Sequence, residues 1–184
     1  MMNQNQNQRP HGQGPHGQGR GGPGGHGGRG PRRPMVKRIS EFKDRMLEVR
    51  RVTRVVAGGK RFSFRATVVV GDMKGRVGIG IAKGLDFAAA VQKAQRQAEK
   101  SVVKVALVDG RTIPYEVEAK NGAALVRLKP AKKGHGLIAG GSLRVVLELA
   151  GVKDISAKIL GRTKNKIANA RAGIDALKSI RVIS

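Results

Sequence analysis

The spacing of apolar residues predicts strands in the first part of the chain. Residues 46–56 and 61–70 are rich in β-branched side chains, and charged residues interrupt the apolar positions of the first run. Glycines within residues 57–60 and 71–75 mark tight turns on either side of the second run. With residues 76–82 as a third strand, this order predicts an antiparallel meander.

Helical spacing replaces the strand pattern after the third strand. Asp86 is placed to cap this helix at its N-terminus. A helix that covers one face of a three-strand antiparallel sheet makes a small α+β domain, which we expect over residues 39–105. The apolar positions with helical spacing are Phe87, Val91, Ala94, Ala98 and Val102.

The second half of the chain predicts another small domain, over residues 106–184. Residues 115–120 and 123–129 have strand-like composition, and Asn121 followed by Gly122 between them is a hairpin signal. A glycine-rich basic loop follows at residues 130–141.

Two helices and one strand are predicted beyond this loop. Ser142 is expected to cap the first helix and Gly151 to end it. Residues 154–160 form the strand, and residues 164–179 form the last helix. The residues expected on its inward face are Ile167, Ala170, Ile174 and Leu177.

The composition of the chain predicts a polyanionic binding partner. The 184 residues contain 37 Lys and Arg against 12 Asp and Glu, a formal net charge of +25. Because such a charge repels itself in the compact state, we expect nucleic acid to relieve it, rather than a membrane or a small substrate. No cysteine is present and no apolar run is long enough to span a bilayer, so we expect a cytoplasmic protein.

Residues 1–38 have a composition of their own, rich in glycine, arginine and proline. Such a segment cannot bury enough apolar surface to offset its ordering entropy, so we expect a disordered basic tail. It is either an arginine-glycine segment that follows an RNA backbone or only a solubilising extension.

The glycines of residues 75–84 raise the question of what approaches the backbone there. The dinucleotide pattern fails because Lys83 stands where the third glycine belongs, and no Ser or Thr follows that lysine as a phosphate-binding loop requires. A double-stranded-RNA-binding module fits better, with Gly78 and Gly80 leaving room for phosphate; a compact strand-to-helix turn is the alternative. The cations expected to cluster at this end are Arg76, Lys83, Lys93, Arg96 and Lys100.

Other candidate chemistry is weaker. Phe62 and Phe64 have the spacing of an RNA-stacking pair, although packing under the helix is the favoured role. His135 has no Asp or Ser partner at a recognisable spacing, so no catalysis, cofactor or metal is predicted.

The second glycine loop leaves one enzymatic alternative open. It resembles the phosphate-binding loop of the galactokinase and mevalonate kinase group, whose chemistry also needs acids to hold Mg²⁺. Asp154, Asp175 and Glu148 are the candidates, each on a separate element. The loop residues that carry this resemblance are Pro130, Gly134, Gly136, Leu137, Gly141 and Ser142.

Three segments together resemble the family of small-subunit ribosomal protein five (uS5). They are "VVAGGKRFSFRATVVVGDMKGRVGIGIAKG", "KKGHGLIAGGSLRVVLELAGVKDISAKILG" and "NKIANARAGIDAL". The resemblance implies a double-stranded-RNA-binding-like first domain and an α/β second domain that shares the kinase scaffold without its catalytic residues. It also implies a structural role at the junction of the head and body of the small subunit, beside the path of messenger RNA, with an influence on translational accuracy.

The same resemblance implies the partners: small-subunit rRNA and the fourth and eighth small-subunit proteins. Gly140, Gly141 and Arg144 match the segment that faces the fourth protein. Together with the basic residues noted above, the resemblance leads us to expect RNA contacts from Arg51, Arg54, Gly58, Gly59, Lys60, Arg61, Arg65, Lys74, Arg76, Lys83, Lys93, Arg96, Lys132, Lys133, Arg162, Lys164, Asn165 and Lys166.

Overall fold

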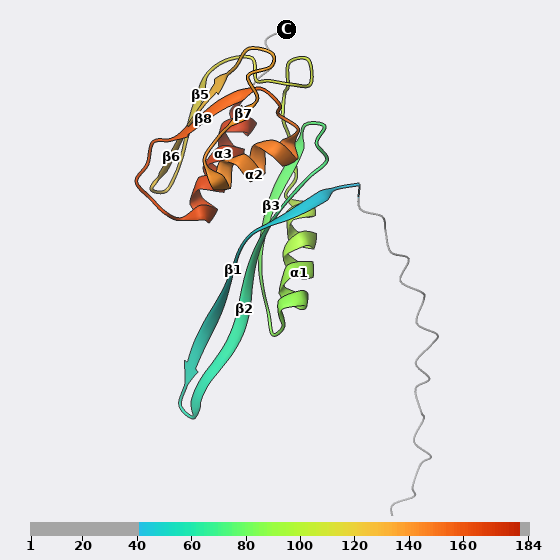
Figure 1. The fold of residues 1–184 in the computed structure, drawn as a ribbon. Coiled ribbons are helices and arrows are strands. Elements are labelled where there is room, and N and C mark those ends of the chain that lie inside the picture. The colour runs from blue at the N-terminus through green and yellow to red at the C-terminus, as the bar shows by residue number, and fades with distance from the viewer. Residues whose placement is uncertain (1–40, 181–184) are drawn as a thin grey trace, which may run out of the picture. The chain divides into compact units, whose positions relative to one another are not determined.

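The computed structural model describes residues 41–180 and arranges their strands in two sheets (Figure 1). The strand orders are β1-β2-β3-β4 and β5-β6-β8-β7. Helices accompany both sheets, so the predicted α+β class is confirmed. The tail predicted over residues 1–38 lies outside the described residues.

The first sheet is the predicted antiparallel meander. It consists of β1 (Lys43–Val56), β2 (Gly59–Gly71) and β3 (Arg76–Gly84), joined by tight turns. A fourth strand, β4 (Val103–Lys104), pairs with β3 and was not predicted. Two residues are too few to produce a periodic signal in the sequence.

The inner half of β2 is buried on both faces. From Ala66 to Gly71 every residue is buried, without the alternation of a sheet that has one wet face. Val68 and Val70 face the core under helix α1, whereas Val69 joins the core of the second sheet and its helices. The continuous apolar run in the sequence therefore reflects two covered faces.

Helix α1 (Phe87–Lys100) packs on β2 and β3 through Ala90, Ala94 and Ala98. Asp86 occupies the N-cap position, as predicted, but its side chain makes no capping hydrogen bond. Phe87 was expected on the apolar face and is 48% exposed instead. The three buried residues of the helix are all alanines, so its backbone lies close to the sheet.

The second sheet combines antiparallel and parallel pairing. The strands β5 (Val117–Asn121), β6 (Ala124–Pro130) and β8 (Ile155–Ile159) pair antiparallel in that order. The short strand β7 (Leu137–Ile138) lies parallel to β8, inside what was predicted as a loop.

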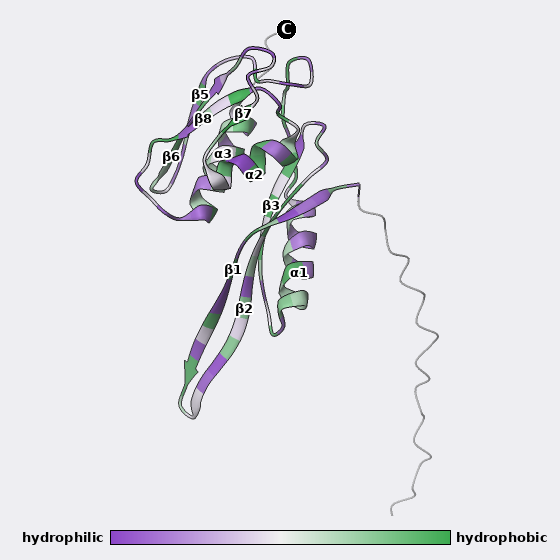
Figure 2. Cartoon of the chain, viewed as in Figure 1, coloured by the Kyte–Doolittle hydropathy of each residue, from purple (hydrophilic) through white to green (hydrophobic). Residues whose placement is uncertain are grey.

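The helices α2 (Gly141–Ala150) and α3 (Lys166–Ser179) contact each other, and α3 packs on β5 and β6. Leu143, Leu147 and Leu177 are fully buried between these layers. Figure 2 shows both strongly hydrophilic and strongly hydrophobic segments on α2.

Two local expectations in this half need correction, and a third is confirmed. The β5–β6 turn consists of residues 122–123, one position later than predicted, because Asn121 pairs with Ala124. Gly140, not Ser142, is the N-cap of α2, and Ser142 is buried in the first turn. Gly151 ends α2, as predicted, and does so in a left-handed conformation.

The turn between β2 and β3 joins the two sheets through the C-terminal end of α2. The amide of Met73 donates to the carbonyl of Leu149 at 3.0 Å, and that of Gly75 donates to Ala150 at 2.9 Å. The described residues, 41–180, all fall within one compact unit. None of the described helices is long and apolar enough to cross a membrane.

Candidate nucleic-acid interface

The outer half of the β1–β2 hairpin extends beyond the rest of its sheet (Figure 1). Strand β3 pairs with β2 only from Phe64 onward, so residues 52–63 form a two-stranded arm. This arm, together with Arg51 at its base, is here called the distal hairpin. Most of these residues are exposed. No third strand of the described residues pairs with this arm, so it is more open to solvent than the inner part of the sheet.

A two-residue turn closes the distal hairpin. Val56 pairs with Gly59, and Gly59 has a φ of 139°, which favours glycine. The fold therefore brings six of the predicted RNA-binding residues together, all of them exposed. They are Arg51, Arg54, Gly58, Gly59, Lys60 and Arg61.

Two arginines face each other across the distal hairpin. Arg54 and Arg61 are cross-strand partners, and like charges placed opposite each other destabilise a strand pair. Within residues 41–180, no carboxylate forms a salt bridge with either of them. An anion bound from outside would relieve this repulsion.

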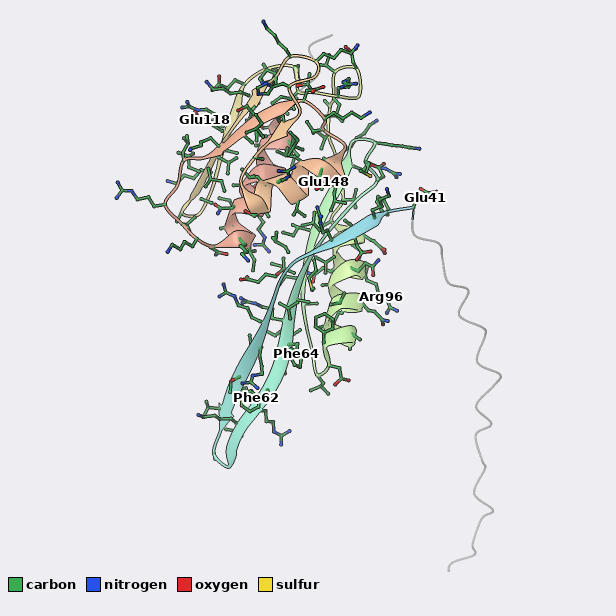
Figure 3. All side chains as sticks on the ribbon, in the orientation of Figure 1. Glu41, Phe62, Phe64, Arg96, Glu118 and Glu148 are labelled. Atoms are coloured by element: carbon green, nitrogen blue, oxygen red, sulfur yellow. The ribbon has the colours of Figure 1, made fainter. Side chains whose placement is uncertain are left out.

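The two phenylalanines of β2 have different environments (Figure 3). Phe64 packs against the core under α1, as predicted. Phe62 lies nearer the turn and is 49% exposed, so the expected core role is wrong for it. The guanidinium carbon of Arg51 lies 4.8 Å from the centroid of the Phe62 ring.

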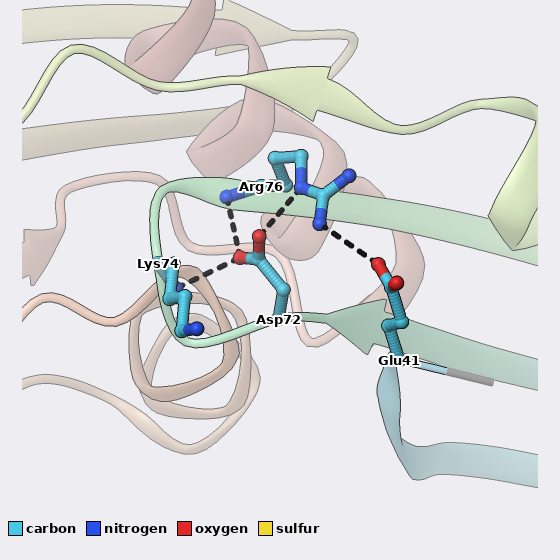
Figure 4. Close-up of polar contacts among 4 residues, drawn as sticks. All are labelled: Glu41, Asp72, Lys74 and Arg76. Atoms are coloured by element: carbon cyan, nitrogen blue, oxygen red, sulfur yellow. Dashed lines mark hydrogen bonds and ion pairs between the residues drawn. The ribbon is translucent and has the colours of Figure 1, made fainter. Parts of the chain in front are cut away.

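A carboxylate organises the turn that carries Lys74 and Arg76 (Figure 4). Asp72 accepts hydrogen bonds from the backbone amides of Lys74 at 2.8 Å and of Arg76 at 2.9 Å, and from Nε of Arg76 at 2.5 Å. The guanidinium of Arg76 also lies 3.5 Å from Glu41. Lys74 is exposed, whereas Arg76 already has two anionic partners.

These contacts change the pKa of both groups. Burial by itself would raise the pKa of Asp72, but the hydrogen bonds from the Arg76 side chain and the two amides outweigh it and lower that pKa. The hydrogen bond with Asp72 raises the pKa of Arg76. Arg76 therefore holds its own turn in place, a role that its sequence position did not indicate.

The glycines of β3 make room for a helix. A Cβ atom on Gly80 would lie 2.1 Å from the carbonyl oxygen of Ala94, and one on Gly78 would lie 2.5 Å from that of Ala98. On Gly84 it would lie 2.6 Å from the amide nitrogen of Ala90. The expectation that Gly78 and Gly80 leave space for phosphate is therefore wrong, because α1 occupies that space.

The basic residues around α1 do not cluster at one end. Since β3 and α1 run in opposite directions, Gly84 lies beside the first turn of α1, whereas Gly78 contacts Ala98 near its last turn. Lys83 is therefore near one end of the helix, while Arg76 pairs with Lys104 beyond the other. The exposed cations on the helix itself, Lys93, Arg96 and Lys100, lie between its middle and its last residue.

A buried carboxylate also organises the second glycine-rich loop. Asp154, 3% exposed, accepts hydrogen bonds from the amides of Gly134 at 3.1 Å and Gly136 at 3.0 Å. Nε of Arg111 donates to its other oxygen at 2.9 Å. Lys132 and Lys133 are exposed on the loop that Asp154 holds.

The pKa of Asp154 is lowered by these donors. The amide of Gly136 contributes most, followed by the side chain of Arg111, and both outweigh the opposing effect of burial. Sequence reasoning treated Asp154 only as a possible metal ligand. Its real partners lie 18, 20 and 43 residues away in the chain, too far for a local pattern to indicate.

The residues expected to face another protein lie at the start of α2. Gly140 and Gly141 are exposed, and so is Arg144 one turn later. Arg144 lines a pocket of about 350 Å³ with Met73, Leu137, Gly151, Val152, Glu148 and Lys153. The pocket is thus formed by the β2–β3 turn, β7 and α2.

The start of α3 carries the last group of predicted RNA-binding residues. Asn165 is the N-cap, and its side-chain oxygen accepts from the amides of Ile167 at 3.1 Å and Ala168 at 3.4 Å. The structure therefore uses Asn165 to end the loop and begin the helix. Arg162, Lys164 and Lys166 are exposed around it.

The acids of the kinase alternative have other partners. Asp154 holds the glycine loop, Asp175 accepts a hydrogen bond from Asn121 at 2.8 Å, and Glu148 pairs with Arg45 at 2.6 Å. Within residues 41–180, no three acidic, histidine or cysteine side chains gather as metal ligands would.

Comparison with known proteins identifies the family. Residues 42–106 match the model of the ribosomal protein S5 N-terminal domain, and residues 119–184 match that of the ribosomal protein S5 C-terminal domain. The chain is 50% identical over 145 residues to small ribosomal subunit protein uS5 of Gloeobacter violaceus, covering 79% of this chain and 65% of that relative. The chain thus spans just under two thirds of the length of that relative.

Two further relatives align over more of their own length. Small ribosomal subunit protein uS5c of Rhodomonas salina is 46% identical over 79% of this chain and 86% of its own. Small ribosomal subunit protein uS5 of Synechococcus elongatus is 48% identical over 77% of this chain and 78% of its own. The two family models follow one another along the chain in the order of the two sheets, and the chain belongs to the ribosomal protein S5 family.

Proposed function

We propose that this chain is a structural, non-enzymatic constituent of the small ribosomal subunit that binds rRNA through its distal hairpin. The observation that carries the proposal is the pair of arginines, Arg54 and Arg61, opposed on an exposed two-stranded arm with no salt bridge from a described carboxylate. Phosphates supply the missing negative charge. Such contacts position RNA without reading its sequence.

The other predicted RNA contacts divide into two groups in this proposal. Exposed cations without a carboxylate partner in the described part of the chain meet phosphate directly, whereas Arg76 and Asn165 shape the backbone that presents their neighbours. The direct group, besides the distal hairpin, comprises Lys74, Lys83, Lys93, Arg96, Lys132, Lys133, Arg162, Lys164 and Lys166. Arg65, half-buried at the base of the hairpin, supports the same contact.

Neighbouring proteins complete the proposed environment. Gly140, Gly141 and Arg144 face the fourth small-subunit protein, and Asp154 holds the loop that leads into them. The eighth small-subunit protein is the second neighbour. We place the chain at the junction of head and body, beside the path of messenger RNA, where its contacts influence translational accuracy.

The proposed organisation has three parts, without membrane, cofactor or small substrate. Residues 39–105 are the RNA-binding-like domain and residues 106–184 the α/β domain, preceded by a basic tail. We place the chain in ribosomes of the cytoplasm.

Sedimentation tests this proposal. Lysate of the organism that encodes the chain is centrifuged through a sucrose gradient at about 0.5 M salt, which removes attachment that depends only on counterion release. The chain is expected with the small subunit, in amounts similar to other core proteins. Recovery near the top of the gradient would overturn the proposal and favour a free RNA-binding protein.

A pair of variants connects this result to the distal hairpin. Arg54→Gln with Arg61→Gln is expected to reduce the fraction that remains with the subunit at high salt. Arg171→Gln with Lys178→Gln removes the same charge from exposed positions of α3 that are not among the proposed RNA contacts, and serves as the matched control. Equal losses from both pairs would mean that net charge, not the hairpin, determines retention.

A further inference from the structure

Phe62 is the residue of the distal hairpin that phosphate binding does not explain. Successive strand residues point to opposite faces, so Phe62 lies on the face opposite Arg61. The strand register places Thr53 opposite Phe62 and Val55 opposite Lys60, and Arg51 is on the same face. We call these five residues the Phe62 face; Arg54 and Arg61 belong to the other face.

Most of the Phe62 face is open to solvent. Phe62 is 49% exposed and Val55 is 72% exposed, although Phe64, two residues along the same strand, packs into the core. Figure 3 places Phe62 toward the turn of the hairpin, past Phe64. Core packing therefore explains one aromatic ring of this strand and leaves the other without a buried role.

We propose that Phe62 and Arg51 form a stacking platform for one unpaired base of an RNA strand. The proposal deepens the RNA binding of the distal hairpin and rests on it. Arg51 covers part of the Phe62 ring, with its guanidinium carbon 4.8 Å from the ring centroid, which restrains the orientation of the ring. A base stacks on the exposed part of the platform, as bases do on aromatic and arginine planes.

The charges around the Phe62 face favour RNA, rather than a protein, as the molecule that binds there. From Val49 to Ala66 the sequence contains no Asp or Glu. An apolar protein surface placed over Phe62 would also remove water from Arg51 and Lys60, whose charges would then lack partners. An RNA strand places a flat base over the ring and its phosphates beside the same cations. The cations of this segment are Arg50, Arg51, Arg54, Lys60, Arg61 and Arg65.

A pair of RNA probes separates base stacking from phosphate binding. One is single-stranded decaadenylate, and the other is the same ribose-phosphate chain without bases. The full-length protein is expected to bind decaadenylate more tightly, by roughly 5- to 100-fold, the effect of stacking one base. Phe62→Leu keeps an apolar side chain of similar size and is expected to reduce this ratio toward one, without changing the affinity for the chain that lacks bases.

Two control variants complete the test. Phe62→Tyr keeps the ring and is expected to keep the ratio, whereas Arg54→Gln with Arg61→Gln weakens binding of both probes by the same factor. An unchanged ratio in Phe62→Leu overturns the stacking platform. If that variant also loses cross-links to a neighbouring ribosomal protein, the Phe62 face binds protein. Neither result affects the proposed ribosomal role, which fails only if the chain leaves the subunit at high salt.

Discussion

Two glycine-rich basic segments of this chain look alike in sequence and serve opposite physical needs. In β3, Gly78 and Gly80 are buried, and the missing side chains let α1 approach the sheet. In the second loop, Gly134 and Gly136 have open space around them and φ values of 90° and 78°. The first pair is needed for room and the second for backbone conformation.

This difference shows what a glycine pattern can and cannot reveal. Both segments contain lysine, and both resemble loops that bind phosphate. The glycines themselves have other roles: those of β3 contact helix α1, and those of the second loop donate their amides to Asp154. The charge of these segments and the reason for their glycines are therefore separate questions.

The largest effect is expected from Gly80→Ala. The added Cβ would lie 2.1 Å from the carbonyl oxygen of Ala94 and 2.4 Å from the amide nitrogen of Ala98, which are both backbone atoms that cannot turn away. The free energy of unfolding should fall by about 3 kcal/mol or more, measured by urea denaturation. Gly58→Ala, in open space without a positive φ, is the control; an equal loss there would refute the packing argument.

Asp154→Ala should have the next largest effect. It leaves two amides and the Arg111 guanidinium without their acceptor. We expect a lower urea midpoint and faster hydrogen exchange at Gly134 and Gly136, while exchange in β3 changes little. Uniform acceleration across both sheets would instead mean that the loop and the core unfold together.

The pH dependence of stability gives a related test. The pKa of Asp154 is lowered by folding, so its stabilisation is fully present above its ordinary value of about 3.9 and is lost as the pH falls below that value. Asp72 acts in the same direction. The urea midpoint of the native chain should therefore approach that of Asp154→Asn between about pH 5 and pH 2. A constant difference would exclude Asp154 as the titrating group.

A smaller loss is expected from Gly134→Ala. Space is available for the Cβ, but a φ of 90° is strained for any residue with a side chain, which costs about 1 to 2 kcal/mol. The loss should appear in the urea midpoint without any change in the exchange of α1. A loss as large as that of Gly80→Ala would remove the distinction between the two segments.

Gly141→Ala should have the smallest effect. Gly141 begins α2, has open space around it and has no positive φ. Alanine restricts the unfolded chain, so the free energy of unfolding should stay the same or rise by up to about 1 kcal/mol. A clear loss of stability would show that this glycine has a conformational role that its geometry does not indicate.

Periodicity and turn composition alone determined much of this protein. The meander, the helix after it and the end of α2 at Gly151 all follow from residues close together in the chain. The long shared motifs identified the family. Helical and strand periods are local properties, so sequence reasoning is strong wherever one element is decided by its own residues.

Tertiary structure alone decided which residue meets which. Phe62 and Phe64 are equivalent in pattern, but β3 and α1 cover only one of them. Gly80 lies against Ala94 because β3 and α1 run in opposite directions, and Asp154 reaches Arg111 across 43 residues. Such pairings depend on how whole elements pack, because burial and hydrogen bonding act between surfaces that are distant in sequence and become neighbours only in the folded chain.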